Sequence, residues 1–180
     1  AGMEVEYLGI PFDSQGIATL NRNLFVSIAG WIEGPVWVGE YGGKDLEKIL
    51  EISESYGLNF WQVQDLELAK DLKKKGFQVA FELNSLEPET VKTVLEEIKP
   101  VFMVIRMDRS SVPSENGLSA ICGMGQVLVH PISTVEDVEF WKAQAPTIGL
   151  QLVSGEEDRP GWMDLSGLQD VLEYLEMENH

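Results

Sequence analysis

The hydrophobic pattern alternates between two kinds of segment along the chain. Short, mostly apolar runs are typical of strands covered on both faces of a parallel sheet. Between them lie longer stretches with an apolar residue at every third or fourth position, which predicts amphipathic helices. We predict seven strands, over residues 5–12, 35–41, 58–64, 77–83, 100–107, 126–130 and 147–153.

Turn and capping residues predict where the intervening helices begin and end. Helices are predicted over residues 24–32, 44–56, 117–124 and 165–177. Two more follow the caps Asp65 and Ser133, and another begins at Pro88. Asp65 and Ser133 are predicted N-caps because their side-chain oxygens can accept the free N–H groups of a first helical turn. Gly57 is the predicted end of the helix over 44–56. Pro11 weakens the first predicted strand because it has no N–H for a sheet hydrogen bond.

Regular alternation of strands and helices predicts one α/β domain over residues 1–180, with parallel strands and outer helices. Two architectures agree with this alternation of strands and helices. A doubly wound sheet that binds nucleotides carries a G-x-G-x-x-G turn after an early strand. Here Gly123-x-Gly125 precedes a predicted strand, so it is not that motif. A (β/α)8 barrel needs eight strands, one more than the pattern predicts.

Charge and composition exclude several classes of function. The chain has 13 Lys plus Arg against 30 Asp plus Glu, a net charge of −17, so we expect no nucleic acid and no anionic membrane as partner. No apolar run approaches the ~20 residues of a membrane span, and no signal peptide is evident, so we expect a cytoplasmic protein. Cys122 is the single cysteine, which excludes a multi-cysteine metal site. We expect neither a metal nor a cofactor.

The stretch over residues 147–164 is the first candidate for a binding site. Its apolar start predicts a buried strand, and Ser154-Gly155-Glu156 follows immediately, just before the predicted last helix. Such a turn can direct backbone N–H groups at an anion near a helix start. Ser154, Gly155 and Glu156 are therefore candidate phosphate contacts, with a simple strand-to-helix turn as the alternative.

Three further candidates lie at or just beyond strand ends. Arg106 lies inside a predicted apolar strand, where a charge must either find a partner or reach a pocket at the strand end. His130 is either an acid–base group or a hydrogen-bonded structural histidine. Asp108 is a candidate acid, although Asp108 and Arg109 can instead cap each other at the surface.

The last strand and loop read Gly149-Leu-Gln-Leu-Val-Ser-Gly-Glu-Glu-Asp-Arg-Pro-Gly-Trp-Met-Asp. This resembles the G-x-D-x-S-S-G-x-E-x-x-P-G-x-K-D pattern of phosphoribosylanthranilate isomerase. Residues 36–52 resemble that family's third strand and helix, 57–64 its V-Q-L-H-G strand, and 2–12 its second strand. The resemblance implies a (β/α)8-type barrel whose first strand and helix have no counterpart in this sequence.

The same resemblance implies a catalytic apparatus that this sequence matches poorly. The family performs an Amadori rearrangement on a ribose phosphate, with a Cys base in a K-I-C-G motif on the first strand and an Asp acid ending the sixth. No residue here matches the base. At the acid position the strand offers Ile105 or Arg106, and Asp108 follows two residues later. Catalysis by general acid and base needs both groups in place.

The family's ligand contacts are also altered. Gln151 stands where the family has a substrate-contacting Asp, and the G-G phosphate turn reads His130-Pro131-Ile132-Ser133, where Pro131 has no N–H to donate. Ser154-Gly155 is retained. The candidate ligand contacts are thus Ser133, Gln151, Ser154, Gly155 and Glu156.

We therefore expect a divergent barrel protein that does not catalyse the isomerisation and binds a small phosphorylated or carboxylated ligand at its carboxyl strand ends. An active isomerase of tryptophan biosynthesis stays open as one alternative, so the chain can still be an enzyme. A non-catalytic interaction protein is the other alternative. A homodimer would cover the exposed edges of an incomplete barrel.

Overall fold

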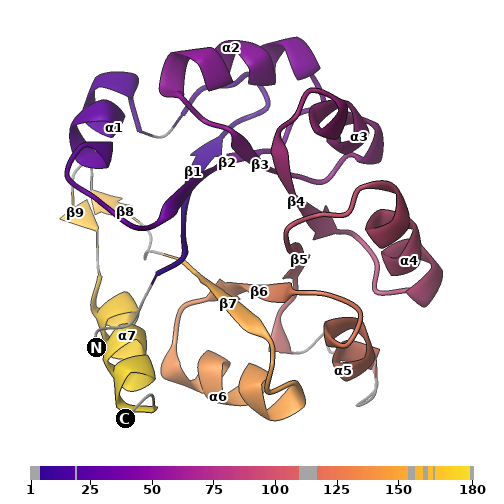
Figure 1. Ribbon diagram of the computed structural model, residues 1–180. Helices are drawn as coiled ribbons and strands as arrows, with labels where there is room; N and C mark the ends of the chain where they lie inside the picture. The colour runs from indigo at the N-terminus through magenta and orange to yellow at the C-terminus, as the bar shows by residue number, and fades with distance from the viewer. Residues whose placement is uncertain are drawn as a thin grey trace. The chain divides into compact units, whose positions relative to one another are not determined.

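Strands and helices alternate along the computed structural model, which describes residues 5–18, 20–109, 117–153, 157–159, 162–163 and 165–178 (Figure 1). The strands are β1 (Tyr7–Phe12), β2 (Val36–Tyr41), β3 (Phe60–Val63), β4 (Gln78–Leu83), β5 (Met103–Arg106), β6 (Val127–Ile132), β7 (Gly149–Leu152), β8 (Glu157–Arg159) and β9 (Trp162–Met163). The helices are α1 (Arg22–Ala29), α2 (Leu46–Tyr56), α3 (Leu66–Lys74), α4 (Pro88–Glu97), α5 (Gly117–Cys122), α6 (Val135–Gln144) and α7 (Ser166–Glu178).

The chain folds as two compact units. We call them the N-terminal unit (residues 5–82 and 92–102) and the C-terminal unit (residues 83–91 and 103–180). A single domain over residues 1–180 stays a prediction. In each unit the paired strands of the main sheet are parallel and follow one another in chain order, as the alternating pattern predicts.

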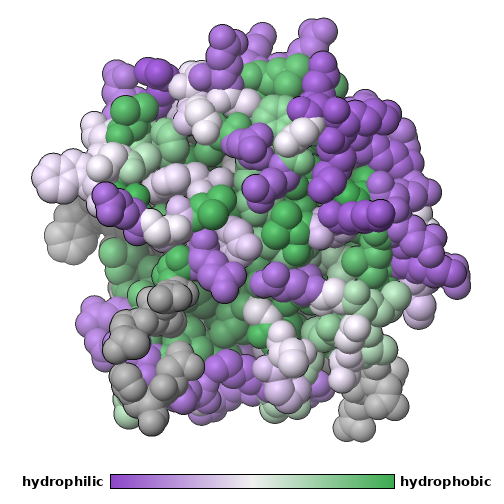
Figure 2. Space-filling model, viewed as in Figure 1, coloured by the Kyte–Doolittle hydropathy of each residue, from purple (hydrophilic) through white to green (hydrophobic). Residues whose placement is uncertain are grey.

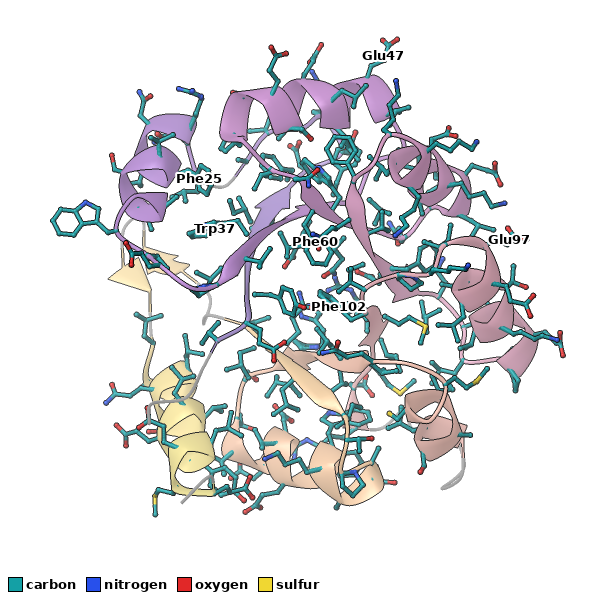
Figure 3. The ribbon with its side chains drawn as sticks, viewed as in Figure 1. Phe25, Trp37, Glu47, Phe60, Glu97 and Phe102 are labelled. Atoms are coloured by element: carbon teal, nitrogen blue, oxygen red, sulfur yellow. The ribbon has the colours of Figure 1, made fainter. Side chains whose placement is uncertain are left out.

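In the N-terminal unit the helices α1, α2 and α3 cover one face of the strands β1 to β4 (Figure 1). Apolar side chains fill the layer between them. Phe25 of α1 and Trp37 of β2 lie edge to face with ring centroids 5.1 Å apart (Figure 3). Phe12 of β1 contacts Trp61 of β3 at 5.6 Å on the same side. This layer explains why the strands read as apolar runs.

The other face of these strands carries a second aromatic cluster. Tyr7, Phe60 and Phe102 meet there, with centroid separations of 5.7, 4.9 and 5.5 Å (Figure 3 labels Phe60 and Phe102). Side chains alternate along a strand, so Gln62 shares the face of Phe60, and its register partner Glu40 lies beside it. This face changes from aromatic to polar toward the carboxyl ends of the strands.

The helix boundaries of the N-terminal unit follow the predicted signals. Asp65 accepts the Leu68 N–H at 3.0 Å and is the N-cap of α3. Gly57 ends α2 with φ of 72°, a left-handed conformation that glycine adopts without steric cost. Hydrophilic side chains gather on the outer side of α3 (purple at the upper right of Figure 2). Lys70 of α3 pairs with Glu67 and with Glu97 of α4.

The C-terminal unit has three parallel strands, β5, β6 and β7, and departs from the sequence prediction in two places. The predicted N-cap Ser133 is wrong by one residue: Thr134 is the cap, because its extended backbone lets Oγ1 accept the Asp137 N–H at 3.2 Å. The predicted loop after β7 contains a small antiparallel hairpin, β8–β9. No helix in the described residues is long and apolar enough to span a bilayer.

Candidate functional site

The carboxyl ends of β5 and β6 bring two candidate residues side by side. Arg106 and His130 are register partners, and the Met107 N–H donates to the His130 carbonyl at 2.9 Å. Arg106 is exposed as the last residue of β5, whereas His130 is only 8% exposed. Because neighbouring residues in register point to the same face of a sheet, both side chains lie on one face.

The third residue of this face comes from β7. The register between β6 and β7 shifts between Val129 and Ile132, so His130 and Pro131 together stand opposite Gln151. Such an irregularity re-aims side chains beside functional sites in many sheets. Gln151 is half-buried. Arg106, His130 and Gln151 form what we call the strand-end face.

Asp108 and Arg109 follow β5 and are both exposed. Arg109 makes an ion pair with Asp137 of α6, its Nε lying 2.8 Å from Oδ1. Asp137 is only 14% exposed, so this pair is better shielded from water than a typical surface pair. Asp108 lies beyond the end of the strand, one residue from this ion pair.

The start of α6 is built around the same carboxylate. Asp137 Oδ2 accepts the Ser133 and Thr134 N–H groups, both at 3.2 Å, and the Ser133 hydroxyl at 3.4 Å. With the bond from the Asp137 N–H to Thr134, these contacts complete a reciprocal capping box. The sequence reasoning missed Asp137, although Thr134-x-x-Asp137 has the spacing of that motif.

The predicted phosphate turn, Ser154, Gly155 and Glu156, lies outside the described residues, and its role stays a prediction. The helix after it is described. Gly167, in the first turn of α7, lies against the loop before α6, because a Cβ on Gly167 would stand 2.9 Å from the Ser133 carbonyl oxygen. A close backbone approach therefore joins the starts of α6 and α7.

The N-terminal unit has its own polar strand ends. Gln62 Nε2 donates to Glu82 Oε2 at 3.4 Å, and Gln62 is only 5% exposed. The Glu40 carboxylate lies over Gly9, where any side chain would collide with it. Each carboxylate lies one residue before the end of its strand, β2 or β4, on the face that also carries the Tyr7 cluster.

Potential metal ligands and the single cysteine were the other reactive groups to place in the described residues. Among them, no three histidine, cysteine, aspartate or glutamate side chains gather in a way that could hold a metal ion. Burial raises the pKa of the Cys122 thiol above its ordinary value of 9.0. Since the thiolate is the nucleophilic form, this shift makes Cys122 less reactive at neutral pH.

Parallel strands in chain order, with a helix between successive strands, define the α/β class of TIM-barrel-like proteins. Solved structures of phosphoribosylanthranilate isomerase share this fold. The enzyme from Pyrococcus furiosus has a TM-score of 0.69 and 16% identity, covering 98% of this chain and 90% of that one. No protein-family model and no curated protein sequence matches the chain.

Two more such structures add information on assembly and ligands. Monomers generated from the dimeric isomerase of Thermotoga maritima align with a TM-score of 0.63 and 16% identity, over 92% of this chain and 85% of that one. An isomerase in complex with reduced 1-(o-carboxyphenylamino)-1-deoxyribulose 5-phosphate aligns with a TM-score of 0.67 and 15% identity, over 97% and 88%. The resemblance inferred from the sequence is confirmed at the level of fold.

Proposed function

We propose that this protein binds a small anionic ligand at the strand-end face and does not catalyse the isomerisation. The observation that carries the proposal is the register pairing of Arg106 with His130, opposite Gln151, at the carboxyl ends of β5 to β7. In TIM-barrel enzymes this end of the strands holds the active site. A phosphorylated or carboxylated ligand suits a face that combines a guanidinium with an imidazole and an amide.

Electrostatics supports an anion at this position. With a net charge of −17, the protein repels anions in general, so a binding site needs a local cation. The Arg106 guanidinium offers a planar set of donors that pairs with a carboxylate or phosphate through two hydrogen bonds. His130 and Gln151 can add donors without adding negative charge.

The same residues argue against the isomerisation. Residue 106, at the end of β5, is an arginine, which stays protonated in proteins and cannot serve as the general acid. Asp108 lies two residues past the strand and is exposed, so it does not stand at the end of β5, where the family resemblance places the general acid. We therefore infer that binding is retained and the proton transfers are lost.

Titration calorimetry with reduced 1-(o-carboxyphenylamino)-1-deoxyribulose 5-phosphate tests the binding. We expect measurable affinity that falls about tenfold or more in Arg106→Gln, because a hydrogen bond to a charged group contributes roughly 1.5–3 kcal/mol. Lys75→Gln is the matched control, since it removes one positive charge from the exposed end of α3. Equal affinity in the parent and Arg106→Gln contradicts the proposed site.

Turnover of phosphoribosylanthranilate tests the loss of catalysis separately. We expect no product above the uncatalysed rate, even at high protein concentration. Turnover that disappears in Arg106→Gln or His130→Gln would overturn the non-catalytic proposal and favour an active isomerase.

A second candidate function, self-association, is favoured by one surface of the N-terminal unit. Trp31 is 90% exposed, and Leu24, Val26 and Ile32 beside it in sequence are also exposed. We call this set the Trp31 surface. Exposed apolar side chains that gather on one surface mark interaction sites, which favours an interaction role for this segment. We propose that a second copy of the chain covers it.

Charge supports a second copy as the occupant. Residues 14–32 contain one charged residue, Arg22, whereas the whole chain has 43. Two copies with a net charge of −17 repel each other least where such an uncharged surface meets itself. Sedimentation velocity should show a dimer that Trp31→Ser dissociates and Glu47→Gln, on exposed α2, leaves intact. A monomeric parent protein at all concentrations contradicts self-association.

A further inference from the structure

Strand β1 comes first in the strand order of its sheet, so in the described part of the chain only one of its edges pairs with another strand. The Val36 N–H donates to the Glu6 carbonyl at 2.8 Å, which places the backbone groups of residue 6 on the β2 side. Alternate residues of a parallel strand direct their backbone groups to opposite edges. Tyr7, Gly9 and Pro11 therefore direct theirs to the outer edge of β1.

The sequence of β1 favours pairing along this outer edge. The strand reads Tyr-Leu-Gly-Ile-Pro-Phe over Tyr7–Phe12 and carries no charged side chain. Uncharged segments of this length, rich in aromatic and branched residues, pair with further copies of themselves unless a proline or a charge interrupts them. Two identical edges that run antiparallel are self-complementary, so the occupant that fits this edge is β1 of a second copy.

Pro11 removes one of the donors that such pairing needs. The residue is exposed and has no N–H, and because it faces the outer edge, the hydrogen bonds between β1 and β2 stay intact. Proline at an outward position protects edge strands in many proteins. Within β1 the outer edge retains the N–H groups of Tyr7 and Gly9, which make a shorter ladder than an ordinary strand pair has.

The loop after β1 covers the next outward position. The Asp13 N–H donates to the Ile17 carbonyl at 3.0 Å, and Phe12 forms an antiparallel bridge with Ala18. Asp13 Oδ1 holds this turn together by accepting the N–H groups of Gln15 at 2.9 Å and Ile17 at 2.8 Å. The chain thus pairs with its own edge at the point where a second copy would continue the ladder.

We propose that Pro11 and the turn at Asp13 keep the outer edge of β1 from pairing with β1 of a second copy. Association between copies is then confined to side-chain surfaces such as the Trp31 surface, which lies outside β1. Two different self-complementary interfaces on one chain would link copies into an open-ended assembly, so the closed edge limits the assembly to a dimer. This limit on size rests on the proposed self-association, whereas the closure of the edge does not.

Amide hydrogen exchange in the parent protein tests the geometry of this edge. The N–H groups of Leu8 and Ile10 point to β2, so we expect them to be protected. Those of Tyr7 and Gly9 should exchange faster, by about tenfold or more, because no strand covers them. Equal protection at all four positions would mean that the outer edge is already paired, which would overturn the proposal.

Opening the edge tests what holds it closed. Pro11→Val combined with Asp13→Ala restores the missing N–H and removes the acceptor that holds the turn, and Trp31→Ser serves as the background so that the Trp31 surface does not contribute. We expect the sedimenting mass to double and exchange of the Gly9 amide to slow by about tenfold or more. Pro35→Val in the same background is the matched control and should change neither, because residue 35 precedes β2, which lies inside the sheet.

Two results would overturn the closure. One is a double variant that is folded by circular dichroism and keeps the mass of its background, and the other is association without protection of Gly9. Pro11→Val alone keeps the turn at Asp13 and tests the proline by itself. It should associate at higher protein concentrations than the double variant, and a folded Pro11→Val protein that never associates would contradict the role of Pro11.

The same double variant with Trp31 intact separates this proposal from the proposed self-association. Each copy then has two interfaces, so we expect assemblies larger than dimers. If the assemblies stop at dimers and the parent protein is monomeric, the Trp31 surface does not self-associate and the closure of the β1 edge stands. If the double variant gains no mass in either background, the closure is wrong, whatever the state of the parent.

Discussion

The indole Nε1 of Trp61 donates a hydrogen bond of 3.0 Å to the hydroxyl of Ser53. Trp61 of β3 has no exposed surface, and Ser53 of α2 is 9% exposed, so the bond fixes a helix to the sheet inside the core of the N-terminal unit. A buried indole N–H needs an acceptor within the protein, because water cannot reach it to accept the hydrogen bond.

Ser53→Ala should therefore destabilise the protein by about 1–3 kcal/mol, the usual cost of leaving a buried donor unsatisfied. Urea unfolding would measure the change in the free energy of unfolding. Ser55→Ala, on the exposed side of α2, is the matched control and should change stability by less than about 0.5 kcal/mol. A cost in Ser53→Ala no larger than in the control would contradict the role of this bond.

Gly39 is held by the same indole ring. A Cβ at Gly39 would overlap three ring atoms of Trp61, which is buried and cannot move aside. Gly39→Ala should cost about 1–3 kcal/mol, as overpacking of a core does. Gly42→Ala is the control, because no atom lies within 4 Å of its Cβ position. Equal unfolding midpoints for the two variants would show that Trp61 has room to shift.

Asp65 should make stability depend on pH in the acidic range. The pKa of its carboxyl is lowered from 3.8, chiefly by the Leu68 N–H and then by Lys44, against the opposing effect of burial. A carboxyl whose pKa is lower in the folded state stabilises the fold at pH values above its pKa in the unfolded state. This stability is lost as the pH falls through its pKa in the folded state. Parent and Asp65→Asn should thus differ most at neutral pH and converge only as the pH falls well below 3.8.

Unfolding free energies measured by urea across that pH range would check the convergence. Asn also caps helices well, so Asp65→Asn removes the charge with little loss of the cap. A difference between the two proteins that stays constant down to acid would mean that the ionised carboxylate contributes nothing.

Cys122 should react slowly with alkylating reagents. Burial raises its pKa above 9.0, so the thiolate fraction at neutral pH is smaller than for an exposed thiol. The rate of alkylation by iodoacetamide, followed as a function of pH, should have its midpoint above 9.0 in the folded protein. The same protein in urea is the control, where the midpoint should fall toward the ordinary value; identical profiles would refute the shift.

Local signals predicted most of the elements because the physical cause of each lies within a few residues. Gly57 and Asp65 end and begin helices as expected, since a left-handed turn and a free N–H can be satisfied locally. Pro11 is tolerated within β1 because β1 stands first in the strand order of its sheet. At such a position a missing N–H costs little. The parallel arrangement followed from the apolar strand pattern.

The details of the candidate site depended on contacts that no local pattern contains. Arg109 pairs with Asp137, and the whole of β6 separates these two residues in the chain. The pairing of Arg106 with His130 requires a register between strands, which sequence spacing alone does not provide.

Strand alternation separates the two tasks of β3. Phe60 and Gln62 lie on one face, while Trp61, between them, packs with Ser53 of α2. The helices are thus attached through the positions that share the face of Trp61. The chemistry at the strand ends depends on the positions that share the face of Gln62. New binding properties can therefore be introduced in this scaffold by substitutions at alternate residues, with little effect on how the chain folds.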